Sequence, residues 1–343
     1  MKRMTLALLI VLLLSPSLRA QAPFYQGKTI RIVVGYLAGD VHDLWARTYS
    51  RHMGKYIPGN PDFIVQNMPG AGTMIAANHI YNLTKPDGLT LGSIAPALYY
   101  AQLTGRKEVQ FDWVKFTWIG SPDRNGHLLF MRSDTPYKTL EDIRNAKEPP
   151  RCSATAIGTS GHDVPKLFED TLGLKFRIIT GYPGGGEQDL ALERGEVQCR
   201  AITIASFFAR EPFHTWHKTG FVRILIQTAR QRHPKIPDVP TIYELMDQYK
   251  TAEAKRRQAT VYLGAGGFGA WPIVSSPGVP LDRAKILREA YTKTLKDPEL
   301  LEEAKKRGWE IKPVSGEELE ALAKEVISQP PEVVEWLKKL LGK

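Results

Sequence analysis

The chain has 343 residues, 43% of them hydrophobic and 24% charged, an ordinary globular composition that excludes a wholly disordered, collagen-like or coiled-coil protein. At roughly 150 residues per domain, this length predicts two domains. The formal net charge is +10, which raises nucleic acid or a small anion as candidate partners.

The first 22 residues are typical of a cleaved secretory signal peptide. Lys2 and Arg3 precede an apolar run over residues 5–14, and Ala20 and Ala22 form a small-residue cleavage motif. The apolar run is shorter than the roughly 20 residues that span a bilayer. We therefore expect cleavage after Ala22 and a secreted, most simply periplasmic, protein. An uncleaved N-terminal anchor is the alternative.

The first third of the mature chain alternates short β-branched runs with helical segments. Strands are predicted over residues 29–34, 63–66 and 89–94, and helices over residues 43–56 and 74–81. Such close alternation predicts a parallel sheet with helices on both faces.

The same alternation restarts in the middle of the chain and predicts a second α/β unit. Its predicted strands cover residues 151–155, 176–180, 197–204 and 222–227, and its predicted helices cover residues 163–172 and 187–194. Three prolines mark residues 233–240 as a linker. Beyond it, residues 259–263 are strand-like, and helices are predicted over residues 282–295, 298–307, 316–327 and 324–343. The Gly-rich segment 249–274 receives no further assignment.

Gly-rich loops follow several of the predicted strands, and each precedes a helix. They cover residues 35–40, 68–73, 158–162 and 182–186. Ligands of open α/β sheets bind outside the carboxyl ends of the strands, and the free N–H groups of a helix N-terminus favour an anion. Two α/β units therefore predict a cleft that holds a carboxylate or phosphate. Each loop taken alone is also common as a plain tight turn.

Cys152 and Cys199 are the two cysteines of the chain, and both fall in predicted strands. In an oxidising compartment they could form a disulfide, provided that the two strands are neighbours. The chain-entropy treatment gives such a loop about 4 kcal/mol of stabilisation. Two buried free thiols are an equally supported alternative.

Five motifs occur in order between about residues 29 and 322. They are Gly35-Tyr36-Leu37-Ala38-Gly39-Asp40 with Ala46-Arg47 behind it, Asn67-Met68-Pro69-Gly70-Ala71-Gly72, Gly158-Thr159-Ser160-Gly161-His162, Tyr182-Pro183-Gly184-Gly185, and Pro237-Asp238-Val239-Pro240-Thr241-Ile242-Tyr243-Glu244. In these motifs the chain resembles the periplasmic solute-binding proteins of tripartite tricarboxylate transporters, also called the Bug-type receptors.

The resemblance implies an α/β, two-lobe periplasmic-binding-protein (Venus flytrap) fold in which each lobe is a mostly parallel sheet with flanking helices. Lobe 1 would comprise residues 23–122 and the returning residues 233–343, and lobe 2 residues 123–232. The resemblance also implies a monomer without cofactor or metal. It would hold a small organic carboxylate through backbone amides and ordered water, and deliver it to the membrane subunits of a secondary transporter.

Matching the motifs residue by residue places one set of ligand-binding residues in each lobe. The first lobe would contribute Tyr36, Ala38, Gly39, Asp43, Ser93 and Ala95. The second lobe would contribute Thr159, Ser160, His162, Tyr182 and Gly184.

Three departures from the family pattern bear on the ligand. Gly35 replaces the usual proline, Asp40 replaces a glycine, and Asp163 replaces an apolar residue after His162. Extra carboxylates argue against a tricarboxylate such as citrate. They are compatible with a ligand that carries a donor group, such as an amide, an amino acid or a hydroxylated acid. An aromatic acid stacked on tyrosines is a further alternative.

A few segments of the chain partly match enzyme motifs. Residues 264–269 match G-x-G-x-x-G, but prolines follow where a dinucleotide fold needs a helix. His214 and His217 lack an evident third metal ligand, and Ser160 beside His162 does not define a nucleophile and base. The alternatives are a ligand sensor that signals to a sensor kinase and, less favoured, a periplasmic hydrolase. The basic excess is spread along the chain, so no nucleic-acid partner is expected.

Overall fold

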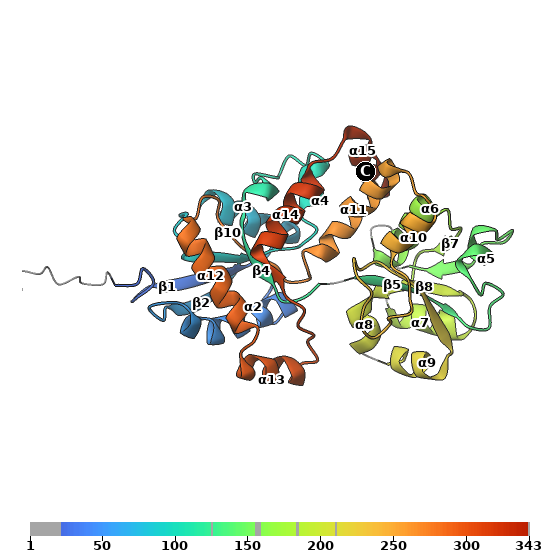
Figure 1. Ribbon diagram of the computed structural model, residues 1–343, viewed down its shortest axis with the longest axis horizontal. Helices are drawn as coiled ribbons and strands as arrows, with labels where there is room; N and C mark the ends of the chain where they lie inside the picture. Colours follow the sequence, from blue (N-terminus) through green and yellow to red (C-terminus); the bar gives the residue numbers. More distant parts are fainter. Residues whose placement is uncertain (1–21, 125, 155–158, 183–184, 210, 342–343) are drawn as a thin grey trace, which may run out of the picture.

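The computed structural model describes residues 22–124, 126–154, 159–182, 185–209 and 211–341. Figure 1 shows two lobes side by side, each built on a sheet with helices around it. The expected signal peptide and its cleavage motif lie almost wholly outside the described residues. Within the described part of the chain, no helix is long and apolar enough to cross a membrane.

The first lobe is built on a six-stranded sheet with the order β11-β4-β10-β3-β1-β2. Its strands are β1 (Thr29–Val34), β2 (Asp62–Asn67), β3 (Thr90–Ser93), β4 (Thr117–Ser121), β10 (Ile273–Ser275) and β11 (Val314–Ser315). Strand β1 pairs in parallel with β2 and β3, whereas β10 is antiparallel to both β3 and β4. Strands β1 to β4 therefore run in one direction, and the sheet is mixed.

Helices cover both faces of this sheet. They are α2 (Val41–His52), α3 (Met74–Asn82), α4 (Tyr99–Leu103), α12 (Leu281–Thr294), α13 (Pro298–Lys306) and α14 (Gly316–Ile327), with short 3-10 turns at η1 (Gly54–Tyr56), η2 (Ala71–Thr73) and η3 (Trp113–Lys115). Strand β1 is a β-branched run with side chains buried on both faces, as a central parallel strand requires.

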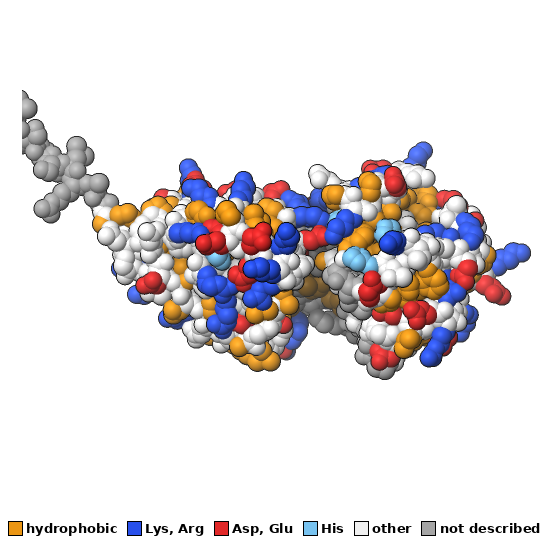
Figure 2. Space-filling model, turned by 90° about the horizontal axis from the view of Figure 1, so that it is seen from below, with side chains coloured by type: hydrophobic (Ala, Val, Ile, Leu, Met, Phe, Trp, Pro, Cys, Tyr) orange, Lys and Arg blue, Asp and Glu red, His pale blue; other side chains and the backbone are white. Residues whose placement is uncertain are grey.

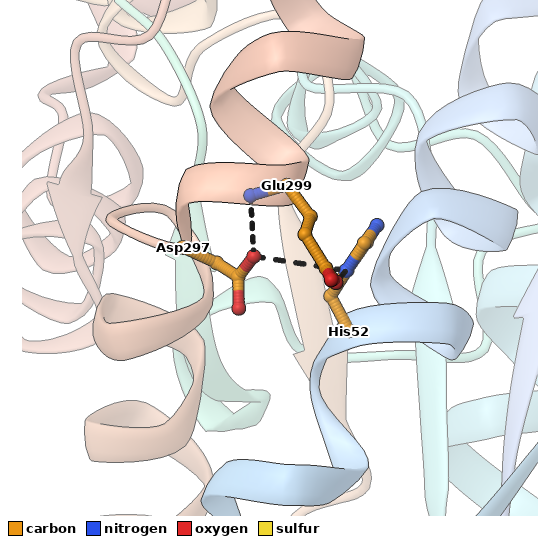
Figure 3. Close-up of side chains that lie close together, drawn as sticks. All are labelled: His52, Asp297 and Glu299. Atoms are coloured by element: carbon orange, nitrogen blue, oxygen red, sulfur yellow. Dashed lines mark hydrogen bonds and ion pairs between the residues drawn. The ribbon is translucent and has the colours of Figure 1, made fainter.

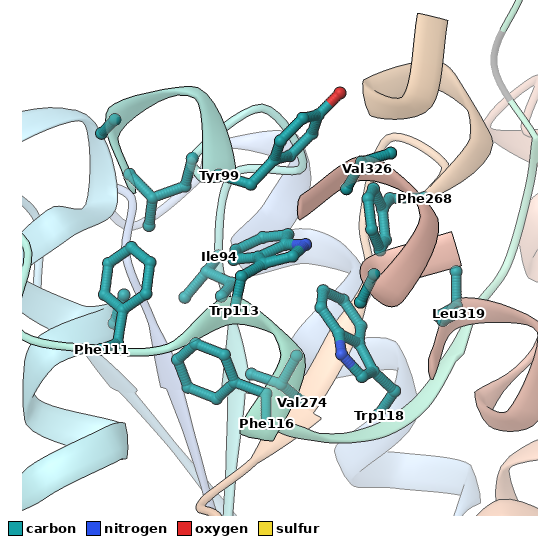
Figure 4. Packing of buried hydrophobic residues seen from close by; sticks show 14 of the residues in the cluster. Ile94, Tyr99, Phe111, Trp113, Phe116, Trp118, Phe268, Val274, Leu319 and Val326 are labelled. Carbon is teal, nitrogen blue, oxygen red and sulfur yellow. The ribbon is translucent and has the colours of Figure 1, made fainter. Parts of the chain in front are cut away.

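One of the two cores of this lobe is rich in aromatic rings. Trp113, Trp118 and Phe268 pack together, with 4.8 Å between the ring centroids of Trp118 and Phe268 (Figure 4). Leu319 and Val326 of α14 close the same cluster. Because Phe268 and α14 come from the last third of the chain, this core can form only when that part returns to the first lobe.

The second lobe is built on a five-stranded sheet with the order β7-β6-β8-β5-β9. Its strands are β5 (His127–Arg132), β6 (Arg151–Ser153), β7 (Arg177–Ile179), β8 (Cys199–Thr203) and β9 (Val222–Gln227). Its helices include α5 (Leu140–Arg144), α6 (Ser160–Leu172), α7 (Gly185–Glu193), α8 (Ile204–Ala209), α9 (Phe213–Thr219) and α10 (Ile242–Gln248). Four strands run in one direction, and β5 is antiparallel to β8 and β9. Strands β4 and β5 were missed by the sequence analysis.

A disulfide joins the two cysteines of the chain. Strands β6 and β8 are parallel neighbours, and Cys152 and Cys199 are register partners with 4.5 Å between their Cα atoms. Both residues are fully buried in the core of the second lobe. Of the two alternatives that the sequence left open, the structure therefore contains the disulfide.

Most of the Gly-rich segment 249–274 forms the helix α11 (Glu253–Gly267). The strand predicted over residues 259–263 is therefore wrong. A β-carbon on Gly264 would lie 2.5 Å from Val326 of α14, and one on Gly267 would lie 2.8 Å from Leu322. The glycines therefore let α11 pack closely on α14. This tertiary packing overrides the β-branched local run that suggested a strand.

Helix α11 belongs to the cores of both lobes. Ala259 and Leu263 pack in the second lobe, whereas Val261 packs in the first. Helix α10 packs on the second lobe through Ile242 and Leu245. The last third of the chain therefore does not return wholly to the first sheet. The domain limits at residues 122 and 232 remain predictions.

The C-terminal helix α15 (Pro331–Leu340) also lies where the lobes meet. Its Val333 and Leu337 pack in the first core, and the Trp336 indole N–H donates to Asp170 of α6 over 2.9 Å. Together with α11, it ties the two lobes along one side of the molecule (Figure 1).

Candidate ligand site between the lobes

The connection between β4 and β5 decides which edges of the two sheets face each other. Strand β4 runs in the direction of β1, β2 and β3, and residues 122–126 lead from its end into β5. Strand β5 is antiparallel to β8, so its first residue lies beside the end of β8. The carboxyl ends of the parallel strands of both lobes therefore face the crossing. Figure 2 shows the surface hollowed between the two lobes.

Asp43 organises the first loop of this edge. Its carboxylate accepts hydrogen bonds from the Gly39 N–H at 2.8 Å, from the Asn67 side chain at 2.9 Å and from Arg47 at 2.9 Å. Only 1% of Asp43 is exposed. Desolvation opposes its charge, but these hydrogen bonds outweigh it and hold the pKa of the carboxyl below its usual value. The structure thus gives Asp43 a role in shaping the loop, and its contact with ligand stays a prediction.

The two departures in the first loop have local explanations. Asp40 is the N-cap of α2, and its carboxylate accepts a hydrogen bond of 2.9 Å from the His42 N–H. Gly35 lies against Thr73 of the second Gly-rich loop, and a β-carbon at position 35 would lie 2.6 Å from the Thr73 β-carbon. The first two loops are therefore packed together at a distance that only glycine allows.

His42 of α2 was not among the expected site residues, yet its side chain lies beside Ser93, the last residue of β3. It shares a hydrogen bond of 3.0 Å with the hydroxyl of Ser93 and stacks on Tyr36, with 3.8 Å between the ring centroids. Burial lowers the pKa of His42 to about 3, so its imidazole is neutral at pH 7. Burial, and then the charge of Asp40, raise the pKa of Tyr36 to about 12. The His42 imidazole and the Tyr36 hydroxyl are therefore both polar and uncharged at pH 7.

The other expected residues of the first lobe lie around this wall. Ala38 and Gly39 are exposed on the loop, and Ala95 is half-buried. The Ala95 N–H already donates a hydrogen bond of 3.0 Å to the Thr73 hydroxyl. The structure therefore brings the first-lobe residues together, and their contacts with ligand remain predictions.

The second lobe presents the start of α6 at its edge. Thr159 is the N-cap of this helix, and Ser160 is its first residue. A β-carbon at Gly161 would lie 2.9 Å from the Ser153 carbonyl oxygen at the end of β6, so the helix begins directly against the strand. Tyr182 is half-buried beside the second core, whereas Gly184 lies outside the described residues.

Asp163 explains the third departure. Its carboxylate hydrogen-bonds to His162 Nδ1 over 2.7 Å and also to the hydroxyl of Tyr262 in α11. Burial, together with the nearby Tyr100 and Asp163, raises the pKa of Tyr262 well above its usual value. The carboxylate is therefore engaged inside the second lobe and orients His162.

The buried Asp123 connects the β4–β5 crossing to the segment that follows α11. Asp123 accepts a hydrogen bond of 2.9 Å from the Ala270 N–H, which links residues 122–126 to the segment after α11. Gly269 has a φ of +77°, and a β-carbon there would lie within 3.0 Å of the Asp123 carboxyl. Burial raises the pKa of Asp123 to about 6.

A separate group of ionisable side chains lies at the junction of α2 and α13. His52, Asp297 and Glu299 converge there, with 3.8 Å from His52 Nδ1 to Asp297 and 3.6 Å to Glu299 (Figure 3). Asp297 already caps α13 by accepting from the Glu299 and Leu300 N–H groups, and it also contacts Lys55 and Tyr56. Because these partners satisfy Asp297, the cluster is explained by its structural role, which is to hold α2 and α13 together.

The residues that partly match enzyme motifs have structural roles or lie on the surface. Residues 264–269 form the end of α11 and the turn after it, so no strand precedes them as a dinucleotide site requires. His214 is exposed on α9, and His217 lies against the rings of Phe207 and Phe208.

Comparison with known proteins identifies the same family that the sequence motifs resemble. The sequence pattern of the tripartite tricarboxylate transporter family receptor matches residues 46–338. A UPF0065 protein of Cupriavidus necator is 30% identical over 234 residues, which are 66% of this chain and 67% of that protein.

Two solved structures share the fold. A TctC solute-binding protein from Polaromonas is 22% identical, with a TM-score of 0.72 over 93% of this chain and 99% of that chain. MatC from Rhodopseudomonas palustris, solved with bound malate, is 21% identical, with a TM-score of 0.53 over 90% and 99% of the two chains. The two-lobe fold is confirmed. The prediction of a receptor rather than an enzyme is confirmed by the matched family.

Proposed function

Because this chain belongs to the tripartite tricarboxylate transporter receptor family, we propose that it is a periplasmic receptor that captures a small organic carboxylate between its lobes. It then delivers the ligand to the membrane subunits of a secondary transporter. In this proposal the first 22 residues are a signal peptide removed after Ala22, and the mature receptor is a monomer without cofactor.

The observation that carries the proposal is the arrangement of the two sheet edges. Loops at the carboxyl ends of β1 and β3 and the start of α6 lie on the two sides of the crossing. The loops bring neutral polar side chains toward one space, and the first turn of α6 adds backbone N–H groups that have no partner within the helix, which suits a carboxylate. The related fold of MatC with bound malate supports this class of ligand.

Net charge supports a small ligand rather than nucleic acid. Figure 2 shows Lys and Arg interspersed with Asp and Glu on both lobes of the face in view. Nucleic-acid binding is driven by clustered positive charge along a backbone track. The basic excess serves at most as a general attraction for anionic solutes.

A thermal-shift screen of small carboxylates on the mature protein tests the proposal. We expect at least one acid to raise the melting temperature in proportion to its concentration, because a ligand that binds only the folded state stabilises it. Tyr182→Ala should weaken binding of that acid. Tyr137→Ala, beyond the far end of β5, is the matched control and should leave it unchanged.

Delivery to a transporter needs a second measurement. A strain that lacks this receptor should lose uptake of the identified acid while it retains the membrane subunits. Stabilisation by no acid in the screen would contradict the receptor proposal. Normal uptake in the deletion strain would contradict the transport role alone.

A further inference from the structure

His127 is the first residue of β5, and the topology places it at the edge where the lobes face each other. It follows the crossing directly, and its register partner is Thr203, the last residue of β8. Thr203 precedes α8 in the chain, so His127 lies beside a strand end and a helix start. Sequence reasoning did not select it, because it belongs to none of the family motifs.

The backbone of His127 is held rigidly. Its N–H donates a hydrogen bond of 2.8 Å to the Thr228 hydroxyl, and its carbonyl accepts one of 2.8 Å from the Thr228 N–H. Alternation along β5 sets the direction of the ring. Leu129 and Met131 pack in the core beneath α6 and α11, so His127 lies on that same face. The start of α6, with Ser160 and His162, lies above this face.

The ring of His127 is half-buried, yet it makes no hydrogen bond or ion pair with any residue that the structure describes. A polar group in such a place normally has a partner. Burial alone lowers the pKa of His127 to about 4, and no neighbouring charge contributes. At neutral pH the ring is an uncharged imidazole with one donor and one acceptor.

The first lobe contains a second uncharged imidazole, that of the buried His42. His42 uses Nδ1 for Ser93, and burial alone likewise lowers its pKa. Two arginines near these edges are already paired, Arg47 with Asp43 and Arg124 with Glu318. A second ligand carboxylate would therefore lose its hydration without meeting a free cation at these groups, whereas a carboxamide or hydroxyl pays a smaller desolvation cost.

We propose that His127 contacts the ligand from the second lobe and that, together with His42, it selects an acid with one carboxylate and one uncharged polar group over the matching diacid. This inference rests on the proposed function and names the ligand class of that site. The carboxylate binds the backbone N–H groups at the loops, and the carboxamide or hydroxyl binds the imidazoles.

Isothermal titration calorimetry of the mature protein with two matched pairs tests this inference. The pairs are succinate with its monoamide and adipate with its monoamide. We expect at least one monoamide to bind about tenfold more tightly than its diacid, which corresponds to about 1.4 kcal/mol. His127→Leu should raise the Kd of that monoamide about tenfold, because the ligand group then faces an apolar side chain.

Two variants serve as controls, and circular dichroism should show that each variant is folded. His127→Gln retains a donor and an acceptor and should keep most of the preference for the monoamide. His214→Leu removes an exposed histidine of the same lobe and should change neither Kd.

The outcomes separate this inference from the proposed function. Tighter binding of the diacids, or an unchanged Kd in His127→Leu, overturns the role of His127 and leaves the receptor intact. If no acid of either pair binds and none in the thermal-shift screen does so, the proposed function fails, and this inference fails with it. If only another acid from the screen binds, a monoamide of that acid that binds no more tightly than the acid itself also overturns the inference.

Discussion

The hydroxyl of Tyr100 donates a hydrogen bond of 2.5 Å to the backbone carbonyl of Tyr262. Tyr100 belongs to α4 of the first lobe, and Tyr262 belongs to α11, whose neighbouring Ala259 and Leu263 pack in the second. Since Tyr262 also hydrogen-bonds to Asp163 beside His162, a chain of contacts runs from the first lobe to the start of α6.

Tyr100→Phe tests the strength of this link. The variant leaves a carbonyl of α11 without its side-chain partner, and we expect it to lower the free energy of unfolding by about 1–2 kcal/mol. Urea denaturation measures the change. Tyr81→Phe is the control, because the Tyr81 hydroxyl makes no hydrogen bond within the described residues, and it should be neutral. An equal loss in both variants would contradict a specific role for Tyr100.

Asp43→Ala should disrupt the first loop. The substitution leaves the Gly39 N–H, the Asn67 amide and Arg47 without their common acceptor. We expect the free energy of unfolding to fall by about 2–4 kcal/mol, because breaking one partner of a buried network strands the others. Asp238→Ala removes an exposed aspartate and should change stability little. Denaturant unfolding that gives the same midpoint for both variants would show that Asp43 does not support the loop.

Gly35→Ala tests the contact between the first two loops. The added methyl meets Thr73, so the variant should lose about 1–3 kcal/mol of stability, as overpacking does. Combining it with Thr73→Gly removes the opposing side chain at a position where φ is +73°, and should restore part of the loss. Gly186→Ala adds a methyl that meets open space and should be tolerated. Simple additivity of the two single changes would argue against direct contact.

Asp123 predicts a pH dependence of stability. Its folded-state pKa of about 6 lies above the ordinary value of 3.8, so the folded protein retains a proton that the unfolded chain releases. The stabilisation is complete below about pH 4 and is lost as pH rises to about 6, by as much as about 3 kcal/mol.

Asp123→Asn should remove this slope, since the amide oxygen can still accept from Ala270. The free energy of unfolding, measured between pH 4 and pH 7, would then decline less in the variant than in the wild-type protein. Asp238→Asn is the matched control. Parallel profiles for Asp123→Asn and the wild type would refute the buried, protonated state.

Local sequence determined the parts of this protein that depend on neighbours in the chain. The β-branched run of β1, the Gly-rich loops after β1 and β2 and the amphipathic helices of the last third were predictable. The ordered motifs, from residues 35–47 to residues 237–244, identified the family before any contact was known. Those signals come from backbone propensity and spacing, which the sequence displays directly.

Only the tertiary structure decided the parts that depend on distant residues. Residues 259–263 form a helix because α11 packs into two cores at once, which no local pattern reports. His42 meets Ser93 across 51 residues of chain, and β6 and β8 become neighbours only when the sheet assembles around the Cys152–Cys199 disulfide. Burial and pairing, which set the charge of each site residue, are properties of the packed molecule, because each side chain responds to the groups that surround it in space.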